Sequence, residues 1–262
     1  MIGIVDYNAG NIKSVERALA FLGVDYVKSK NPADLKDAEK LIFPGVGEAK
    51  YAMDQLKKSG FDSFLRDTAQ SNRLLLGICL GSQIIFEHSC EGDVECLGLL
   101  KGDIVHFSTL FKKNNIDERL FKVPQIGFND LSRNKNALAD PIFNDIPKDS
   151  SFYFVHSYVI QAENANDVLA TCDYGIKVPS VIKHKNIYAC QFHPEKSGVA
   201  GLQLLKNFCS ASSERKVSEC ELSDDELGKR KCGGEELGER EFSKRELGEQ
   251  DFRKQNLSGV AK

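Results

Sequence analysis

The stretch of this chain best suited to chemistry surrounds a cysteine. Cys79 follows an apolar run of strand length, residues 74–78, and lies between Gly77 and Gly81. This pattern is typical of a nucleophile elbow, in which a reactive side chain occupies a tight turn between a strand and a helix. The glycines allow such a turn without Cβ clashes, and a segment of helical character, residues 82–88, follows. An unreactive cysteine buried on a core strand is equally compatible with this stretch alone.

A second stretch supplies the groups that a cysteine nucleophile needs. His193 and Glu195 are separated only by Pro194, so in an extended segment their side chains point the same way. Pro194 also disfavours helix at His193. A carboxylate placed there can fix the imidazole tautomer while the other ring nitrogen faces a thiol. Alone, the motif fits an exposed histidine in a turn, but with Cys79 it completes a set of nucleophile, base and orienting group.

An oxyanion site is predicted from two backbone segments. The loop Pro44-Gly45-Val46-Gly47 can present backbone N–H groups in an unusual conformation, although a simple glycine turn would give the same sequence. The N–H of Leu80, directly after the cysteine, is the second expected donor.

Alternating strands and helices must bring these stretches together. In the first half of the chain this alternation predicts an α/β fold with a doubly wound, mostly parallel sheet and helices on both faces. Ligands of such sheets bind beyond the carboxyl ends of the strands, where Cys79 and the Pro44–Gly47 loop fall. We expect strands at residues 2–6, 24–28, 40–43, 73–78, 102–107, 121–128, 152–160, 167–172, 180–183 and 187–192. We expect helices at 12–22 (capped by Asn11), 49–57, 61–71 and 199–209, and a loop or short helical turn at 140–147.

Composition excludes several classes of protein. The chain has 262 residues, 41% of them hydrophobic, and a net charge of −3, which gives no electrostatic case for binding nucleic acid or an anionic membrane. The N-terminus reads as a first strand rather than a signal peptide, and no apolar run is long enough to span a bilayer. The eight cysteines lack C-x-x-C spacing, so we predict no metal site and reduced thiols in the cytoplasm.

The chain divides at residue 209 into a compact domain, residues 1–209, and a charged tail, residues 210–262. Apolar residues recur at every fifth position of the tail, from Leu222 to Leu257. This spacing forms no stripe on an α-helix, whereas it resembles a pentapeptide-repeat β-helix. Charged or bulky residues stand where the interior of such a coil needs small ones, which favours a disordered, repeat-expanded tail. A linker to a separate domain is the minor alternative.

The motifs together resemble a known family. The segment 77–83, the Pro-Gly-Val-Gly loop and the Gln-Phe-His-Pro-Glu segment 191–195 resemble class I (triad) glutamine amidotransferases. Three further segments, 6–11, 152–158 and 193–197, make the chain most similar to glutaminase subunits of imidazole glycerol phosphate synthases. The resemblance covers residues 1 to about 209 and leaves the tail outside.

The resemblance implies a role for each motif. Cys79 would attack the side-chain amide of L-glutamine and form a thioester, His193 would carry the proton to departing ammonia, and Glu195 would orient the imidazole. The family positions that stabilise the tetrahedral intermediate correspond to Val46, Gly47 and Leu80. Those that bind glutamine correspond to Gln83, Glu91, Ser157 and Tyr158, and those that face a partner protein correspond to Tyr153 and Lys196. No cofactor is implied.

The implied partner is a (β/α)8-barrel cyclase that forms a heterodimer with the glutaminase and receives its ammonia for histidine biosynthesis. The chain departs from the family pattern at Ser82, where methionine is common, and at segment 124–129, where Pro-His-x-Gly-Trp-Asn is common. Two other functions therefore stay open. One is a paralogous subunit that feeds ammonia to a sugar-amidating synthase in surface-polysaccharide biosynthesis, and the other is a non-catalytic scaffold.

Overall fold

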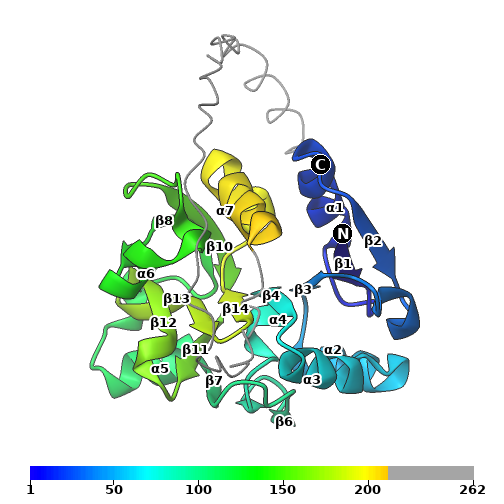
Figure 1. Cartoon of the computed structure of the whole chain (residues 1–262). Helices are drawn as coiled ribbons and strands as arrows, with labels where there is room; N and C mark the ends of the chain where they lie inside the picture. The colour runs from blue at the N-terminus through cyan, green and yellow to red at the C-terminus, as the bar shows by residue number, and fades with distance from the viewer. Residues whose placement is uncertain (212–262) are drawn as a thin grey trace, which may run out of the picture. The chain divides into compact units, whose positions relative to one another are not determined.

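The computed structural model describes residues 1–211, and the predictions for the tail fall on residues outside this part. A sheet of eight strands, in the order β2-β1-β3-β4-β14-β13-β12-β9, forms the centre of the molecule (Figure 1). The first five strands of this order run parallel, and β13, β12 and β9 continue the sheet in antiparallel fashion. The predicted doubly wound, mostly parallel α/β sheet is confirmed.

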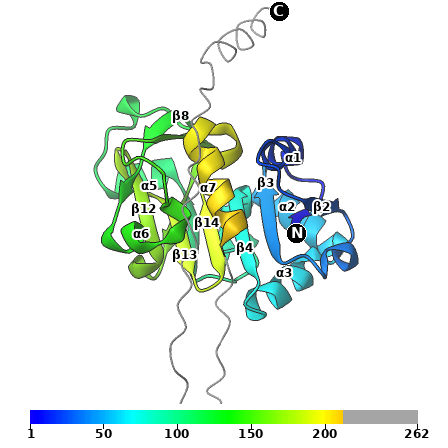
Figure 2. The same cartoon turned by 45° about the horizontal axis from the view of Figure 1, so that its top comes forward.

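Apolar side chains on both faces of the strands hold the helices on the sheet. In β4, Leu74 and Leu76 belong to one hydrophobic cluster and Leu75 to the other, as the alternation of side chains along a strand requires. The first cluster also contains residues of α1 and α7, and the second contains residues of α2 and α3 (Figure 2). Helices on both faces explain why the central strands are buried throughout.

The element boundaries mostly follow the expected ranges. Two small sheets, β10 with β8 and the group β11-β7-β5-β6, accompany the main one. The helices are α1 (Ile12–Phe21), α2 (Ala49–Ser59), α3 (Phe61–Gln70), α4 (Leu80–Gln83), α5 (Phe107–Lys113), α6 (Lys135–Ala139) and α7 (Gly198–Ser210), with 3₁₀ turns η1 (Pro32–Leu35), η2 (Glu118–Leu120), η3 (Pro141–Phe143), η4 (Ala165–Asp167) and η5 (Pro194–Lys196). The strands are β1 (Ile2–Val5), β2 (Tyr26–Ser29), β3 (Lys40–Gly45), β4 (Leu74–Cys79), β5 (His88–Ser89), β6 (Val94–Glu95), β7 (Gly102–His106), β8 (Gln125–Asp130), β9 (Ser132–Arg133), β10 (Ser151–His156), β11 (Tyr158–Ala162), β12 (Val168–Tyr174), β13 (Ile176–His184) and β14 (Ile187–Cys190).

Four local predictions were wrong. The helix expected at residues 82–88 is the single turn α4, which ends at Gln83, because the chain then bends into β5. The strand expected at 121–128 begins only at Gln125, after Pro124, which has no N–H to donate to a ladder. The strand expected at 152–160 is broken at Ser157, because β10 pairs with β8 whereas β11 pairs with β7. Asn11 precedes α1 but makes no side-chain cap.

No helix within residues 1–211 is both long enough and apolar enough to cross a membrane.

Candidate active site

Cys79 lies on the predicted elbow. It is the last residue of β4 and directly precedes α4, and its backbone has φ 53° and ψ −111°. A non-glycine residue at positive φ is strained, and such backbone strain is typical of residues in active sites. The neighbouring glycines are required by close backbone approach, because a Cβ on Gly77 would lie 2.9 Å from Gly81 O and a Cβ on Gly81 would lie 2.0 Å from Phe43 O.

We expect Gly81→Ala to disrupt the elbow. The new methyl group would overlap a backbone carbonyl that belongs to β3 and cannot move alone, so the free energy of unfolding should fall by about 3 kcal/mol or more. Gly23→Ala is the control: it has φ 66° but no atom within 4 Å of its Cβ, and should cost about 1–2 kcal/mol of strain. Urea unfolding measures both, and equal losses would contradict this account of the turn.

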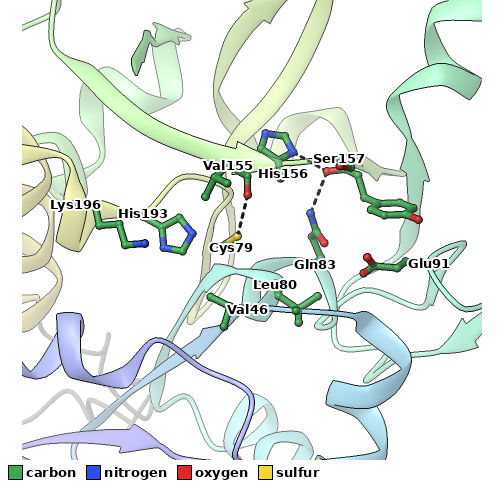
Figure 3. A pocket seen from close by; sticks show the side chains of 12 residues that line it. Val46, Cys79, Leu80, Gln83, Glu91, Val155, His156, Ser157, His193 and Lys196 are labelled. Carbon is green, nitrogen blue, oxygen red and sulfur yellow. Dashed lines mark hydrogen bonds between the residues drawn. The ribbon is translucent and has the colours of Figure 1, made fainter. Parts of the chain in front are cut away.

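His193 and Glu195 form a buried pair next to Cys79. His193 Nδ1 lies 2.8 Å from Glu195 Oε1, and the two side chains are only 2% and 1% exposed. Glu195 belongs to the 3₁₀ turn η5 rather than to an extended segment, so the predicted contact forms by a different local geometry. Because Nδ1 is engaged by the carboxylate, Nε2 is the nitrogen left for the cysteine, and Figure 3 shows the ring and the thiol side by side.

Two histidines adjoin the cavity, and their environments separate their roles. Burial lowers the pKa of His193, but hydrogen bonds with Cys79 and Glu195 outweigh it and raise that pKa from 6.5 to about 9. Burial lowers the pKa of His156 to about 4, and its Nδ1 lies 2.7 Å from the carbonyl oxygen of Tyr158. His156 is therefore neutral, with Nδ1 as a donor, and His193 is the ring that can carry a proton in the reaction.

A cavity of about 270 Å³ opens at Cys79, a size suited to a small metabolite (Figure 3). It brings together ten residues predicted from the sequence, whereas Glu195 lies behind His193 and Tyr153 does not line it. The lining residues are Val46, Gly47, Cys79, Leu80, Gln83, Glu91, Val155, His156, Ser157, Tyr158, His193 and Lys196. Val155 and His156 are not among the predicted site residues, because no sequence signal marks the end of β10 as part of the cavity wall.

Two acceptors lie side by side in the cavity. Gln83 donates its Nε2 hydrogens to Tyr158 O (3.0 Å) and Gln191 Oε1 (2.9 Å), which leaves its Oε1 without a partner among the described residues. Glu91 accepts the N–H of Ala49 through one oxygen (2.9 Å), and burial raises the pKa of its carboxyl group. An amide oxygen and a carboxylate suit a cationic group, and Figure 3 shows both on the side of the cavity away from His193.

The predicted oxyanion loop is only partly arranged. The N–H of Val46 donates to Ala9 O (2.9 Å) and so does not face Cys79. Gly47 has φ 95° with nothing near its Cβ position, so the loop has room to change conformation. Leu80, directly after the nucleophile, lines the cavity. Of the two expected donors, the N–H of Val46 is therefore engaged away from the cysteine.

The two residues expected to face a partner lie together at the edge of the site. Lys196 Nζ is 5.9 Å from the ring centroid of Tyr153, which is 5.5 Å from that of Phe128. Phe128 and Ile126, which lie two residues apart on β8, are 59% and 62% exposed, so two large apolar side chains lie together on one side of this strand.

Within residues 1–211, no cluster of three or more histidine, cysteine, aspartate or glutamate side chains could hold a metal ion.

Comparison with known proteins identifies the family. The model of the family "Glutamine amidotransferase class-I" matches residues 3–211. The chain belongs to the class-I glutamine amidotransferases. It is 42% identical over 220 residues to the imidazole glycerol phosphate synthase subunit HisH of Bacillus subtilis strain 168, an alignment that covers 84% of this chain and all of the relative. The HisH subunit of Dehalococcoides mccartyi is 41% identical over 79% of this chain and 96% of its own.

Solved structures agree on the fold of this amidotransferase. The chain is similar to a glutamine amidotransferase of known crystal structure with a TM-score of 0.60 and 18% identity, over 79% of this chain and 96% of the other. PurLQS from Thermotoga maritima gives a TM-score of 0.56 at 18% identity, with the same two coverages. An amidotransferase needs a group that attacks an amide and a group that protonates the departing nitrogen, and the cavity presents Cys79 and His193 together.

Proposed function

We propose that this chain is the glutaminase subunit of an imidazole glycerol phosphate synthase, which hydrolyses L-glutamine and supplies ammonia for histidine biosynthesis. One observation carries the proposal: a buried His193–Glu195 pair adjoins a strained Cys79 at the mouth of a small cavity. The roughly 40% identity to HisH subunits over nearly their whole length supports the choice of pathway.

The first half of the reaction forms a thioester. Cys79 gives its proton to His193 Nε2, and the sulfur attacks the amide carbon of the glutamine side chain, so that a C–S bond forms and negative charge moves to the carbonyl oxygen. The N–H of Leu80 donates to this oxygen. The imidazolium, held by Glu195, then protonates the amide nitrogen, the C–N bond breaks and ammonia leaves.

The second half regenerates the enzyme. His193 takes a proton from a water molecule, and the resulting nucleophile attacks the thioester carbon. The C–S bond breaks, glutamate is released, and the proton returns to the Cys79 sulfur. Throughout, the α-ammonium group of the substrate binds to Gln83 Oε1 and Glu91, with Ser157 and Tyr158 along its backbone.

The acceptor of the ammonia is a partner subunit, which we propose to be a (β/α)8-barrel cyclase. The exposed Ile126 and Phe128, next to Tyr153 and Lys196, provide an apolar surface beside the active site for it. Because the N–H of Val46 donates to Ala9, the free subunit lacks one oxyanion donor. Partner binding that turns this N–H toward Cys79 would couple glutamine hydrolysis to the presence of the acceptor enzyme.

The test is glutamate release by the full chain, alone and with the cyclase subunit from the same organism. We expect kcat for glutamine hydrolysis to be roughly 10² to 10³ times higher in the complex than in the chain alone, which is the effect of one oxyanion donor. If a sugar-amidating synthase activates the chain and the cyclase does not, the chain supplies ammonia to the polysaccharide pathway instead. A chain that releases no glutamate with either partner would contradict the proposal.

A further inference from the structure

A buried glutamine that the mechanism does not use adjoins the substrate-binding end of the cavity. Gln191 follows the end of β14 and is 0% exposed. Its backbone N–H donates to Ser180 O (3.0 Å), and its side-chain Oε1 accepts from Gln83 Nε2 (2.9 Å). Gln191 does not line the cavity, so any effect that it has on the substrate passes through Gln83.

The two hydrogens on Gln83 Nε2 both have acceptors. One goes to the carbonyl oxygen of Tyr158 (3.0 Å), which can only accept, and the other goes to Gln191 Oε1. The amide of Gln83 therefore has one orientation, with Nε2 toward the protein and Oε1 toward the cavity. Figure 3 shows the nitrogen of Gln83 directed to the backbone next to Ser157, and Glu91 beside Gln83.

Packing alone does not account for an amide at position 191. Gln191 Nε2 is buried and has no hydrogen-bond partner among residues 1–211. A buried donor without a partner disfavours folding, and an apolar side chain of the same length would fill this space without that cost. The useful atom of Gln191 is consequently its oxygen, which Gln83 contacts.

We propose that Gln191 is a positioning residue for substrate recognition. By accepting the second N–H of Gln83, it holds Gln83 Oε1 toward the α-ammonium group of bound glutamine. Without it, one hydrogen of the Gln83 amide loses its buried acceptor and only the carbonyl oxygen of Tyr158 still holds the amide. The NH₂ group then turns more readily toward the cation, which it repels. This inference rests on the proposed function, because it concerns the same substrate.

The test uses two reagents that alkylate the nucleophile of the full-length chain. 6-Diazo-5-oxo-L-norleucine carries the α-ammonium group, whereas iodoacetamide does not. In Gln191→Met, we expect the second-order rate of inactivation by the diazo compound to fall about tenfold or more, and the rate of alkylation by iodoacetamide to stay within about twofold. For L-glutamine, KM should rise about tenfold while kcat stays within about twofold.

Three variants make the result specific. Gln191→Glu keeps an oxygen at the same reach and should restore discrimination between the reagents. Gln191→Asn keeps a buried amide but withdraws the oxygen by one methylene, so it should show the selective loss even if the methionine variant does not fold. Gln125→Met is the matched control, since it removes a fully buried amide that contacts Asn129 and Cys172 instead of Gln83.

Equal slowing with both reagents would show that Gln191 only supports the elbow, and no slowing with either would show that it has no role; both outcomes overturn the inference. A wild-type chain that reacts with iodoacetamide but never with the diazo compound would instead refute the proposed function.

Discussion

Cys79→Ser should abolish glutamine hydrolysis while the fold is kept. The hydroxyl group fits where the thiol stands, at the end of β4, but serine is a far weaker nucleophile than cysteine without a strong base. We expect kcat to fall by about 10³ to 10⁴ or more, as happens when a member of a catalytic triad is removed. The release of glutamate measures the activity, and thermal unfolding should show a Tm within about 2 °C of the wild type.

Cys90→Ser is the matched control. Cys90 is an exposed free thiol outside the cavity, so its loss should leave hydrolysis unchanged. A Cys79→Ser chain that still hydrolyses glutamine at a comparable rate would exclude Cys79 as the nucleophile and leave the scaffold hypothesis standing.

Glu195→Gln should lower activity and shift its pH dependence. The carboxylate accepts from His193 Nδ1 at 2.8 Å, and hydrogen bonding and charge from it help to raise the pKa of His193 to about 9. The imidazolium must protonate the departing nitrogen, so activity of the wild type should fall as pH rises through about 9. Removing the negative charge lowers the pKa of His193, and the alkaline fall should therefore move to lower pH in the variant.

We expect kcat at neutral pH to drop by about 10² to 10⁴ in Glu195→Gln, because the amide also permits the wrong imidazole tautomer. Initial rates between pH 6 and 10 measure both effects, with Glu118→Gln, at an exposed position away from the cavity, as the control. An unchanged alkaline limb in the variant would show that Glu195 does not set the pKa of the reacting histidine.

Chain order and residue chemistry predict the catalytic centre well. Cys79 and the Pro44–Gly47 loop end adjacent parallel strands, and His193 follows the strand that pairs with β4 on its other side. The carboxyl ends of neighbouring parallel strands meet at one edge, so the sheet topology alone brings these groups together. The short spacing from His193 to Glu195 then makes their contact almost independent of the exact local conformation.

Features that depend on tertiary contacts could not be predicted. The break at Ser157 arises because the two halves of one apolar run pair with strands of two different sheets. The N–H of Val46 donates to Ala9, which lies 37 positions earlier in the chain, and no sequence pattern in either segment indicates this bond. The bond from Gln83 to Gln191 likewise spans 108 positions, and it is visible only after folding has buried both amides.

The most direct test of the account is to find where a glutamine-analogue electrophile reacts. The full chain is treated with 6-diazo-5-oxo-L-norleucine, with and without excess L-glutamine, and the modified peptide is identified by mass spectrometry. The account predicts a single adduct on Cys79 that L-glutamine suppresses, and none on the exposed Cys90. An adduct on another residue, or labelling of Cys79 that L-glutamine does not slow, would contradict the assignment of this cysteine as the nucleophile of a glutaminase.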